Sequence, residues 1–429
     1  MHRVSQIDAN EGSPFFAREG RSGCEVAKRA QEKIEGGILN SRLGIAAKIR
    51  DRRATLLPVT LVAVIAVISV PMYGSAAAER QPVQNLAETS KNRGTAVLSA
   101  DMAEPSVTSS SSERICVGSD CGFATLQKAL AAALPGAIVT LKPGIYKEAA
   151  VESTNNIVIK AAGAHLEGVA AEGKAALVIK GTGVTIEGLE CSDIRVPDGN
   201  GACIRIEGGE LVLRNMHIHH CEMGILGRGD LTIEDSTIDH IGVEGSELGH
   251  GVYSVGHQLT IRRSRILASG FEGHEVKSRS ENTLIEDSVI ASIDGVDSRQ
   301  IDVPDGGTLI VRNSVIEKGP HSVQTDLIGY GLERRKDKLQ DHRTNSIVIE
   351  GNTIIVDRPG SFTLLRTIDA DSMDVHDNKI VGGPINAADA IVGGPPGAAK
   401  GNHWYRDRAT AGLPAIPDLP PPGNLGSPR

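Results

Sequence analysis

A short pattern recurs seven times between residues 211 and 380, and it limits the folds open to this chain. Each copy has apolar residues, a polar pair, a small turn residue, one more residue and then isoleucine, as in LTIEDSTI (231–238) and TLIEDSVI (283–290). The last position is isoleucine in all seven: Ile218, Ile238, Ile266, Ile290, Ile316, Ile354 and Ile380. Units of 20 to 38 residues are too short to bury an apolar face alone. Equivalent positions must therefore stack into columns.

Each unit is expected to contain strands. Apolar and polar residues alternate with period two, and Asp, Asn or Ser stands at the bend, where a short polar side chain tolerates left-handed backbone angles. A second short strand precedes each copy by eight to ten residues, as in HGVYSV (250–255) and HEVKSR (274–279). Leucine-rich repeats have a similar length, but their Leu-x-x-Leu-x-Leu pattern is absent. With one strand on each side of the bend and the strand that precedes the copy, each turn has three strands. This arrangement is an all-β parallel β-helix.

The start of this region is predicted to form a helix that caps the first turn of the solenoid. Leu126, Leu130 and Leu134 are spaced as on one face of a helix, and a solenoid needs its first turn covered. The segment FATLQKALAAALPGAIVTLKPGIYKE (123–148) resembles the usual opening of the right-handed parallel β-helix, or pectin-lyase-like, superfamily with its PbH1-type repeats. The resemblance covers about residues 115–382. It implies a single-stranded right-handed solenoid with an N-terminal capping helix, and no particular reaction.

The remaining segments suggest export. We divide the chain into an N-terminal tail (1–55), a signal peptide or membrane anchor (56–78), a flexible linker (79–113), the β-helix (114–392) and a Pro/Gly-rich tail (393–429). The run LLPVTLVAVIAVISV (56–70) follows basic residues and precedes Ala76-x-Ala78, as in a cleavable signal. The long segment before it fits an uncleaved anchor instead. Either places the body in the periplasm or outside the cell, with the inner membrane touched only by this segment.

Composition restricts the classes of partner that the protein is expected to bind. The chain carries net charge −8, and the residues after Ala78 hold 34 Lys/Arg against 46 Asp/Glu. Such an acidic body argues against nucleic acid as a partner. The six cysteines lack the spacing of a zinc module. Cys191 occupies an isoleucine position of the repeat, and Cys116 and Cys121 bracket a short turn where they could pair. We expect a monomer.

The outward residues of the preceding strands are the candidate site. If Ile204, Val252, Val276, Ile301 and Leu327 point inward, strand alternation turns their next neighbours outward. Tyr253, Lys277 and Asp302 then lie in line on successive turns, with Arg279 on the same face. A solvated ion pair between Lys277 and Asp302 is the plain alternative.

Two histidines and five further residues complete the candidates. His250 and His274 hold the same rung position, where they either stack at strand starts or exchange protons. The other histidines of the repeats, His217, His219, His220 and His240, lie off this face and are expected to be structural. The proposed substrate contacts are Arg205, Glu275, Gln300, Asp326 and Tyr330.

This column suits an acidic, uronate-containing polysaccharide. Eliminating or epimerising a uronate needs a cation at the carboxylate, a base for the C5 proton and an acid for the leaving oxygen. Arg279 fits the first role; Lys277, His274 or Tyr253 fits the base, and Tyr253 or His250 the acid. The Lys-x-Arg pair resembles that of alginate lyases and chondroitinase B. Their acidic calcium ligands cannot be placed here, so calcium stays open and no cofactor is assigned.

Two other functions fit the same sequence. An inverting hydrolase would use Asp302 with Glu275 or Asp326 across a water-sized gap. A non-catalytic solenoid would bind glycans on the envelope, resting on Tyr253 and Tyr330 because aromatic residues are scarce. The insertion at 331–344 is expected to be a loop beside the site.

Overall fold

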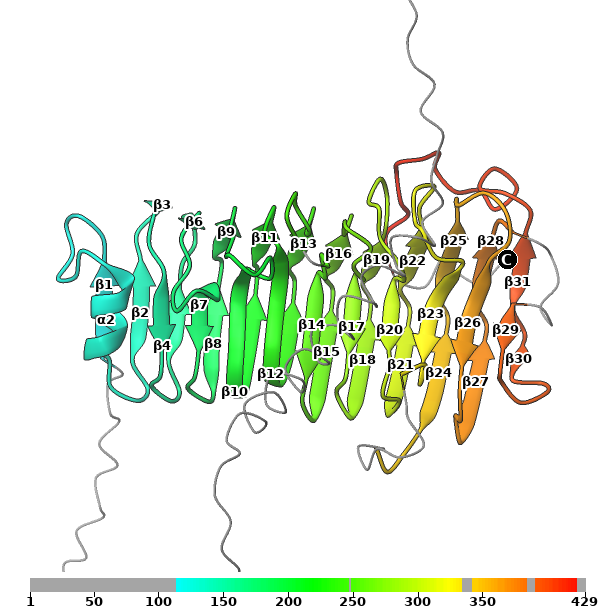
Figure 1. Cartoon of the computed structure of the whole chain (residues 1–429), viewed down its shortest axis with the longest axis horizontal. Coiled ribbons are helices and arrows are strands. Elements are labelled where there is room, and N and C mark those ends of the chain that lie inside the picture. Colours follow the sequence, from blue (N-terminus) through cyan, green and yellow to red (C-terminus); the bar gives the residue numbers. More distant parts are fainter. Residues whose placement is uncertain (1–112, 247, 334–341, 384–389, 423–429) are drawn as a thin grey trace, which may run out of the picture. The chain divides into compact units, whose positions relative to one another are not determined.

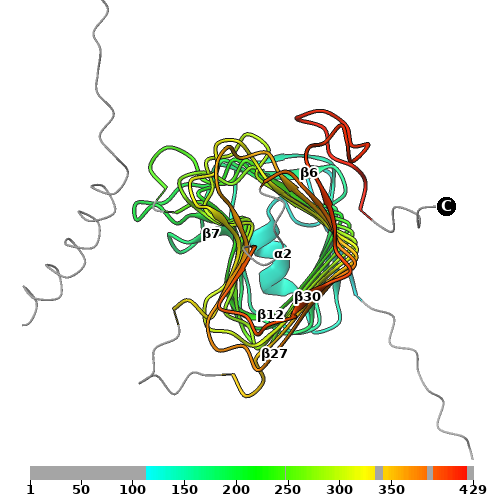
Figure 2. The same cartoon turned by 90° about the vertical axis from the view of Figure 1, so that its right-hand side faces the viewer.

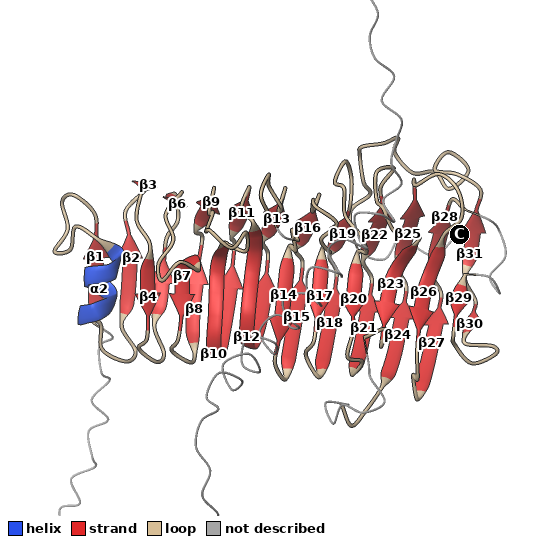
Figure 3. Cartoon of the chain, in the orientation of Figure 1, coloured by secondary structure: helices blue, strands red, loops and turns tan. Residues whose placement is uncertain are grey.

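The computed structural model describes residues 113–422 except 247, 334–341 and 384–389, and shows the expected right-handed parallel β-helix. Successive turns stack in one direction along the solenoid (Figure 1), and strands dominate the described part of the chain (Figure 3). Each complete turn contributes one strand to each of three columns. The predicted signal or anchor at 56–78 and the linker lie outside the described residues. No helix within the described ranges is long and apolar enough to span a membrane.

The three columns follow the rungs in order. The first column consists of β4 (Ala150–Glu152), β7 (Ala175–Ile179), the first halves of β10 (Ala202–Arg214) and β12 (Met223–Glu234), β14 (Val252–Val255), β17 (Val276–Ser278), β20 (Ile301–Val303), β23 (Asp326–Tyr330), β26 (Thr363–Thr367) and β29 (Ile391–Val392).

The second column consists of β1 (Arg114–Val117), β2 (Ile138–Leu141), β5 (Val158–Lys160), β8 (Val184–Glu187), the second halves of β10 and β12, β15 (Gln258–Arg262), β18 (Asn282–Glu286), β21 (Thr308–Arg312), β24 (Ser346–Glu350), β27 (Ser372–His376) and β30 (Ala399–Lys400). The third consists of β3 (Gly144–Tyr146), β6 (Ala164–Glu167), β9 (Glu190–Ser192), β11 (His217–His219), β13 (Thr237–Asp239), β16 (Arg265–Leu267), β19 (Val289–Ala291), β22 (Val315–Lys318), β25 (Thr353–Val356), β28 (Lys379–Val381) and β31 (His403–Tyr405).

The repeated isoleucines form one buried ladder in the third column. Each pairs in register with its equivalent on the next turn, and Cys191 takes the position before Ile218. All seven are at most 1% exposed. Trp404 of β31 follows Ile380 and packs against the end of the core. This confirms that the isoleucines stack in the interior.

The bend between the second and third columns is built as the repeat predicts. Asp235, Asp287 and Asn313 adopt left-handed backbone angles, with φ of 52°, 49° and 51°. The next residue is a buried serine or asparagine in six of the seven repeats and forms a polar ladder, in which the backbone N–H of Ser264, for example, donates to Ser288 Oγ. Buried hydroxyls and amides thus satisfy the turn's backbone donors.

The capping helix is shorter than predicted. Helix α2 (Leu126–Ala132) is capped by Thr125, whose side chain accepts from the Lys128 N–H. The helix lies within the outline of the coil when viewed along the stack (Figure 2). Leu126 and Leu130 are buried in the core. Leu134 is 66% exposed, against expectation, because the helix has ended before Pro135.

The C-terminal boundary also differs from the prediction. Strands β30 and β31 lie beyond residue 392 and pair with β27 and β28, so the solenoid continues to Tyr405. The chain then folds back along the outside, where Arg408 binds Asp357 through a nearly buried ion pair.

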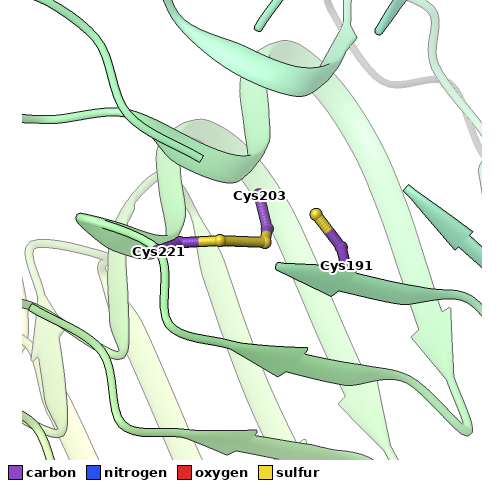
Figure 4. Close-up of side chains that lie close together, drawn as sticks. All are labelled: Cys191, Cys203 and Cys221. Carbon is purple, nitrogen blue, oxygen red and sulfur yellow. A yellow bond between two sulfur atoms is a disulfide. The ribbon is translucent and has the colours of Figure 1, made fainter. Parts of the chain in front are cut away.

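Four of the five cysteines in the described part of the chain form two disulfides. Cys116 pairs with Cys121, as the sequence allowed, and Cys203 pairs with Cys221 across one turn. Cys191 keeps its thiol in the interior beside the second disulfide (Figure 4), and burial raises its pKa well above the ordinary value. It acts as the small apolar residue that the repeat predicted.

Candidate functional site

The first column carries the predicted line of polar side chains. Tyr253 of β14 pairs in register with Lys277 of β17, which pairs with Asp302 of β20. Val252, Val276 and Ile301 are buried beneath them, as strand alternation requires. At about 4.8 Å per rung the three side chains span roughly 10 Å.

The Lys277–Asp302 pair is buried rather than solvated. Lys277 Nζ lies 3.7 Å from Asp302 Oδ2, and the side chains are 11% and 2% exposed. Burial raises the pKa of Asp302, and the positive charges of Lys277 and Arg299 offset it only in part. The plain alternative of a solvent-screened surface pair therefore does not describe this contact.

Arg279 joins the column from just past the end of β17. Its Nε donates to the Tyr253 hydroxyl oxygen at 3.0 Å, and its terminal nitrogens bind the carboxylates of Asp305 and Glu333. Lys277 Nζ lies 5.8 Å from the centre of the Tyr253 ring. Arg279 thus contacts the Tyr253 hydroxyl, while Lys277 lies near the face of the same ring.

Glu333 is a contact that the sequence did not identify. It belongs to the inserted segment after β23, and its Oε1 lies 3.0 Å from Lys277 Nζ while Oε2 accepts from Arg279. Burial raises the pKa of Glu333, but the hydrogen bond from Arg279 and the charge of Lys277 outweigh it, so the pKa is lowered. We call the position between Lys277 Nζ and the Arg279 guanidinium the two-cation seat. In this structure the carboxylate of Glu333 occupies it. The insertion does lie beside the site, as predicted, although 334–341 fall outside the described residues.

His250 and His274 stack and hold the starts of strands. Their ring centres lie 5.1 Å apart; His250 Nδ1 accepts the backbone N–H of His274, and His274 Nδ1 accepts that of Arg299. Burial lowers the pKa of His250 to about 3 and that of His274 well below its usual value. This confirms the stacking alternative.

The same contacts remove the proton-transfer roles suggested for these rings. A neutral imidazole whose Nδ1 accepts a hydrogen bond carries its proton on Nε2, so neither nitrogen has a lone pair for a substrate proton. His274 Nε2 instead faces Asp302 Oδ2 at 3.5 Å. Tyr253 is the side chain of the column left for both the base and the acid, with Lys277 as a cation between carboxylates.

The predicted substrate contacts separate into different places. Arg205 of β10 lies outward in line with Tyr253, two turns earlier, with Leu226 between them. Glu275 is buried, and its carboxylate accepts from the backbone N–H and hydroxyl of Ser269. Gln300 is also buried and donates to Ser292 and Asp297.

Glu275 and Gln300, which the sequence suggested as substrate contacts, therefore lie in the interior. Both immediately precede a strand of the first column, where the connecting turn folds its polar residues inward and they satisfy one another. Burial, together with the charge of Asp297, raises the pKa of Glu275 well above its ordinary value. Neither side chain reaches a ligand on this face.

The register of β23 differs by one residue from the prediction. Ile301 pairs with Ile328, and Val303 with Tyr330, so Tyr330 points inward, is 0% exposed and donates its hydroxyl hydrogen to Gly307 O. Leu327 and Ile328 are both apolar, so alternation alone could not choose between them. Tyr330 was wrongly assigned to the outer face.

Gly329 takes the outward position beside Asp302. A Cβ on Gly329 would lie 2.6 Å from Asp302 Oδ1 and 2.9 Å from Arg299 Cδ, so a glycine is needed here. Asp326, at the start of β23, is nearly buried and bound by Arg366 through Nε at 2.8 Å and Nη2 at 3.0 Å. Asp326 contacts both Arg366 and Arg299, and its side chain is almost inaccessible to solvent.

The carboxylates of this network do not form a calcium site. Within the described residues, Asp302, Asp305, Asp326 and Glu333 each contact an arginine or lysine. Calcium needs six to eight oxygen ligands whose charge is directed at the ion. The donor set therefore does not fit Ca²⁺.

A separate hollow of about 700 Å³ lies near the C-terminal end. Val356, Val381 and Arg408 are among its lining residues, where the returning chain crosses β25 and β28. None of the candidate residues lines it.

Comparisons with known proteins identify similar backbones. No protein-family model and no curated protein matches the sequence. An alginate lyase from Paenibacillus sp. str. FPU-7 is 16% identical, with a TM-score of 0.45 over 68% of this chain and 98% of that one. A pectin methylesterase from Aspergillus niger is 10% identical (TM-score 0.33; 73% and 93%). The Streptococcus pneumoniae surface protein and adhesin PfbA is 9% identical (TM-score 0.30; 64% and 85%).

Proposed function

We propose that this protein acts on an acidic, uronate-containing polysaccharide by β-elimination or C5 epimerisation. One observation carries the proposal: Lys277 and Arg279 together hold the carboxylate of Glu333, beside the hydroxyl of Tyr253. A uronate carboxylate has the same charge and fork of oxygens. It would replace Glu333 in this seat when the polymer binds.

The two-cation seat would favour removal of the C5 proton, which is the difficult step of the reaction. Neutralising the uronate carboxylate stabilises the negative charge that develops when the C5 proton leaves. Tyr253, as phenolate, takes that proton; the neighbouring Arg279 Nε–H stabilises the phenolate oxygen. In elimination the C4–O bond then breaks, a C4=C5 double bond forms, and the tyrosine proton passes to the leaving oxygen. In epimerisation a water molecule gives a proton to C5 from the opposite face, and Tyr253 returns the proton it took to solvent, which restores the phenolate.

Asp302 and the histidine pair hold the cations in place. Asp302 lies against Lys277 Nζ and His274 Nε2, and Arg299 lies 3.4 Å from its other oxygen. Fixed partners lower the cost of ordering the lysine when substrate arrives. In this proposal the charge at the uronate carboxylate is neutralised by the chain's own cations, without calcium.

The inverting hydrolase ranks lower. Its candidate acid–base pairs use Asp302 with Glu275 or Asp326, but Glu275 faces Ser269 and Asp326 is bound on both oxygens by Arg366. An inverting hydrolase needs a water molecule between its two carboxyl groups. Here that water would have to displace the partners that already bind these carboxylates. A binding-only solenoid would use the same two-cation seat without turnover.

The proposal extends to the setting of the protein. Two disulfides within the β-helix support an oxidising, exported location. The net negative charge of the body argues against a nucleic-acid partner, and binding of an acidic polymer would depend on the local cations Lys277 and Arg279. We propose that the protein works as a monomer.

Activity assays test the proposal. Purified protein is incubated with alginate, pectate and glycosaminoglycans, with and without Ca²⁺, while the ultraviolet absorbance of unsaturated uronate and deuterium uptake at C5 are followed. We expect one of these signals with at least one polymer, lost in Tyr253→Phe. Lys160→Met is the matched control, because Lys160 is an exposed strand lysine paired with Glu187 in another column. Absence of both signals with every polymer would refute an eliminative or epimerising function.

A further inference from the structure

A histidine-rich surface lies on the third column, away from the candidate site. It is formed by outward side chains of β6, β9, β11 and β13 and the bends that follow them. Its members are His165, Glu190, His217, His219, His220, Asp239 and His240. The sequence suggested structural roles for the four histidines between 217 and 240. Their contacts show something more specific.

Three of these side chains converge from three successive turns. His165 Nδ1 lies 3.9 Å and His219 Nε2 lies 3.2 Å from the same oxygen, Glu190 Oε1. One nitrogen or oxygen from each of the three residues falls within 4.8 Å of those of the other two. A carboxylate oxygen thus stands between two imidazole nitrogens.

Backbone pairing fixes this arrangement. His165 pairs with Glu190, and His219 pairs with the next outward residue of β9, Ser192, without a register shift along β6, β9 and β11. Each side chain therefore projects from a hydrogen-bonded ladder rather than from a loop. Sites on strands hold their donors more rigidly than sites on loops.

The separations suit a small tetrahedral ion. Zinc bonds to imidazole nitrogen and carboxylate oxygen are about 2.0–2.2 Å, which places tetrahedral donors roughly 3.3–3.5 Å apart. The observed 3.2 and 3.9 Å lie on either side of that range. Small side-chain rotations would bring all three donors to one ion.

A second layer of contacts orients His165. The Ser192 hydroxyl donates to Asp193 Oδ2 at 2.7 Å, so its oxygen accepts from His165 Nε2–H at 2.9 Å. The ring proton is then on Nε2, and the Nδ1 lone pair faces Glu190 Oε1, another acceptor. A metal-binding histidine usually donates its other ring N–H to a polar acceptor, and here the Ser192 hydroxyl supplies that acceptor.

His219 is prepared in a similar way. Its Nδ1 lies 2.8 Å from Nδ1 of His220, which can accept its ring proton and leave Nε2 facing Glu190. Neutral imidazole is the form that binds metals.

We propose that His165 Nδ1, Glu190 Oε1 and His219 Nε2 bind a divalent transition-metal ion, with Zn²⁺ the best match. Two imidazoles and a carboxylate favour Zn²⁺ over Ca²⁺ and Mg²⁺, which prefer oxygen donors alone. Glu190 is half-exposed, so the fourth coordination position faces solvent and can take water or a ligand. This site differs from a cysteine-based zinc module and does not depend on the proposed action on polysaccharides.

Metal titration of the full chain tests the proposal. Chelator-treated protein is titrated with Zn²⁺ in competition with a chromogenic chelator, and Co²⁺ substitution reports coordination through its visible absorption. We expect one tight Zn²⁺ per chain, weakened tenfold or more in Glu190→Gln and His219→Ala, and an intense four-coordinate Co²⁺ spectrum. Ser192→Ala, which removes only the relay, should weaken binding roughly 10–100-fold.

Two variants serve as controls. His257→Ala removes an exposed histidine that pairs with Glu281 elsewhere, and should bind Zn²⁺ as the unaltered protein does. His240→Ala removes a histidine from the neighbouring contact with Asp239 and should also retain binding. Equal affinity in unaltered protein and Glu190→Gln would overturn the proposal. Loss in His240→Ala without loss in His219→Ala would overturn the ligand set.

Discussion

Lowering the pH should destabilise the β-helix through His250. Its ring is 3% exposed, its Nδ1 accepts the His274 N–H, and its pKa falls from 6.5 to about 3 because of burial and the nearby Lys277 charge. The unfolded chain therefore takes up the proton first as pH falls. The stabilisation is fully present above about pH 6.5 and is lost progressively as the pH falls toward 3.

The size of the effect follows from linkage. Each unit of difference in pKa is worth about 1.36 kcal/mol. Between pH 7.5 and pH 5 the unfolded ring becomes protonated and the folded ring does not, which lowers the free energy of unfolding by about 2 kcal/mol. Near pH 3 the total reaches roughly 4–5 kcal/mol.

Comparing the unaltered protein with His250→Asn isolates this effect. The asparagine carbonyl oxygen can accept the same N–H but does not titrate, so other groups contribute alike to both proteins. Urea unfolding followed by circular dichroism at pH 7.5 and pH 5 should show a loss about 2 kcal/mol smaller in the variant. Identical losses in both proteins would refute the reasoning that His250 is held neutral by burial.

Three further predictions concern packing and the two-cation seat. Ile290→Ala should lower the free energy of unfolding by about 2–5 kcal/mol in urea titrations, because it empties a fully buried position of the ladder; a loss below 1 kcal/mol would contradict a packed column. Lys277→Met should cost about 1–3 kcal/mol, because Asp302 keeps only Arg299 and His274 as partners, whereas an unchanged midpoint would point to a solvated pair. Glu333→Gln should strengthen calorimetric binding of uronate oligosaccharides about 3–10-fold by removing the internal competitor, and weaker binding would show that Glu333 helps to hold the ligand.

The repeat predicted the fold because the same physical requirement acts on every turn. Seven isoleucines at one position can be buried together only if the turns stack, and the stacking then aligns Tyr253, Lys277 and Asp302. Strand alternation in the sequence therefore predicts this column, and the pairing of the strands agrees with it.

Alternation failed where neighbouring residues did not differ in polarity or where the chain left the strand. Leu327 and Ile328 are both apolar, so the register of β23 and the burial of Tyr330 could not be read from the pattern. Glu275 lies in a turn whose polar residues face inward. Glu333 reaches the site from an insertion, and no periodicity links a loop residue to a position on the column.

A crystal structure of the protein with a bound uronate oligosaccharide would test the central claim most directly. We predict a uronate carboxylate between Lys277 and Arg279, with Glu333 displaced and the Tyr253 hydroxyl facing C5 of the same sugar. An oligosaccharide bound elsewhere, with Glu333 still in contact with both cations, would contradict the function proposed for this column.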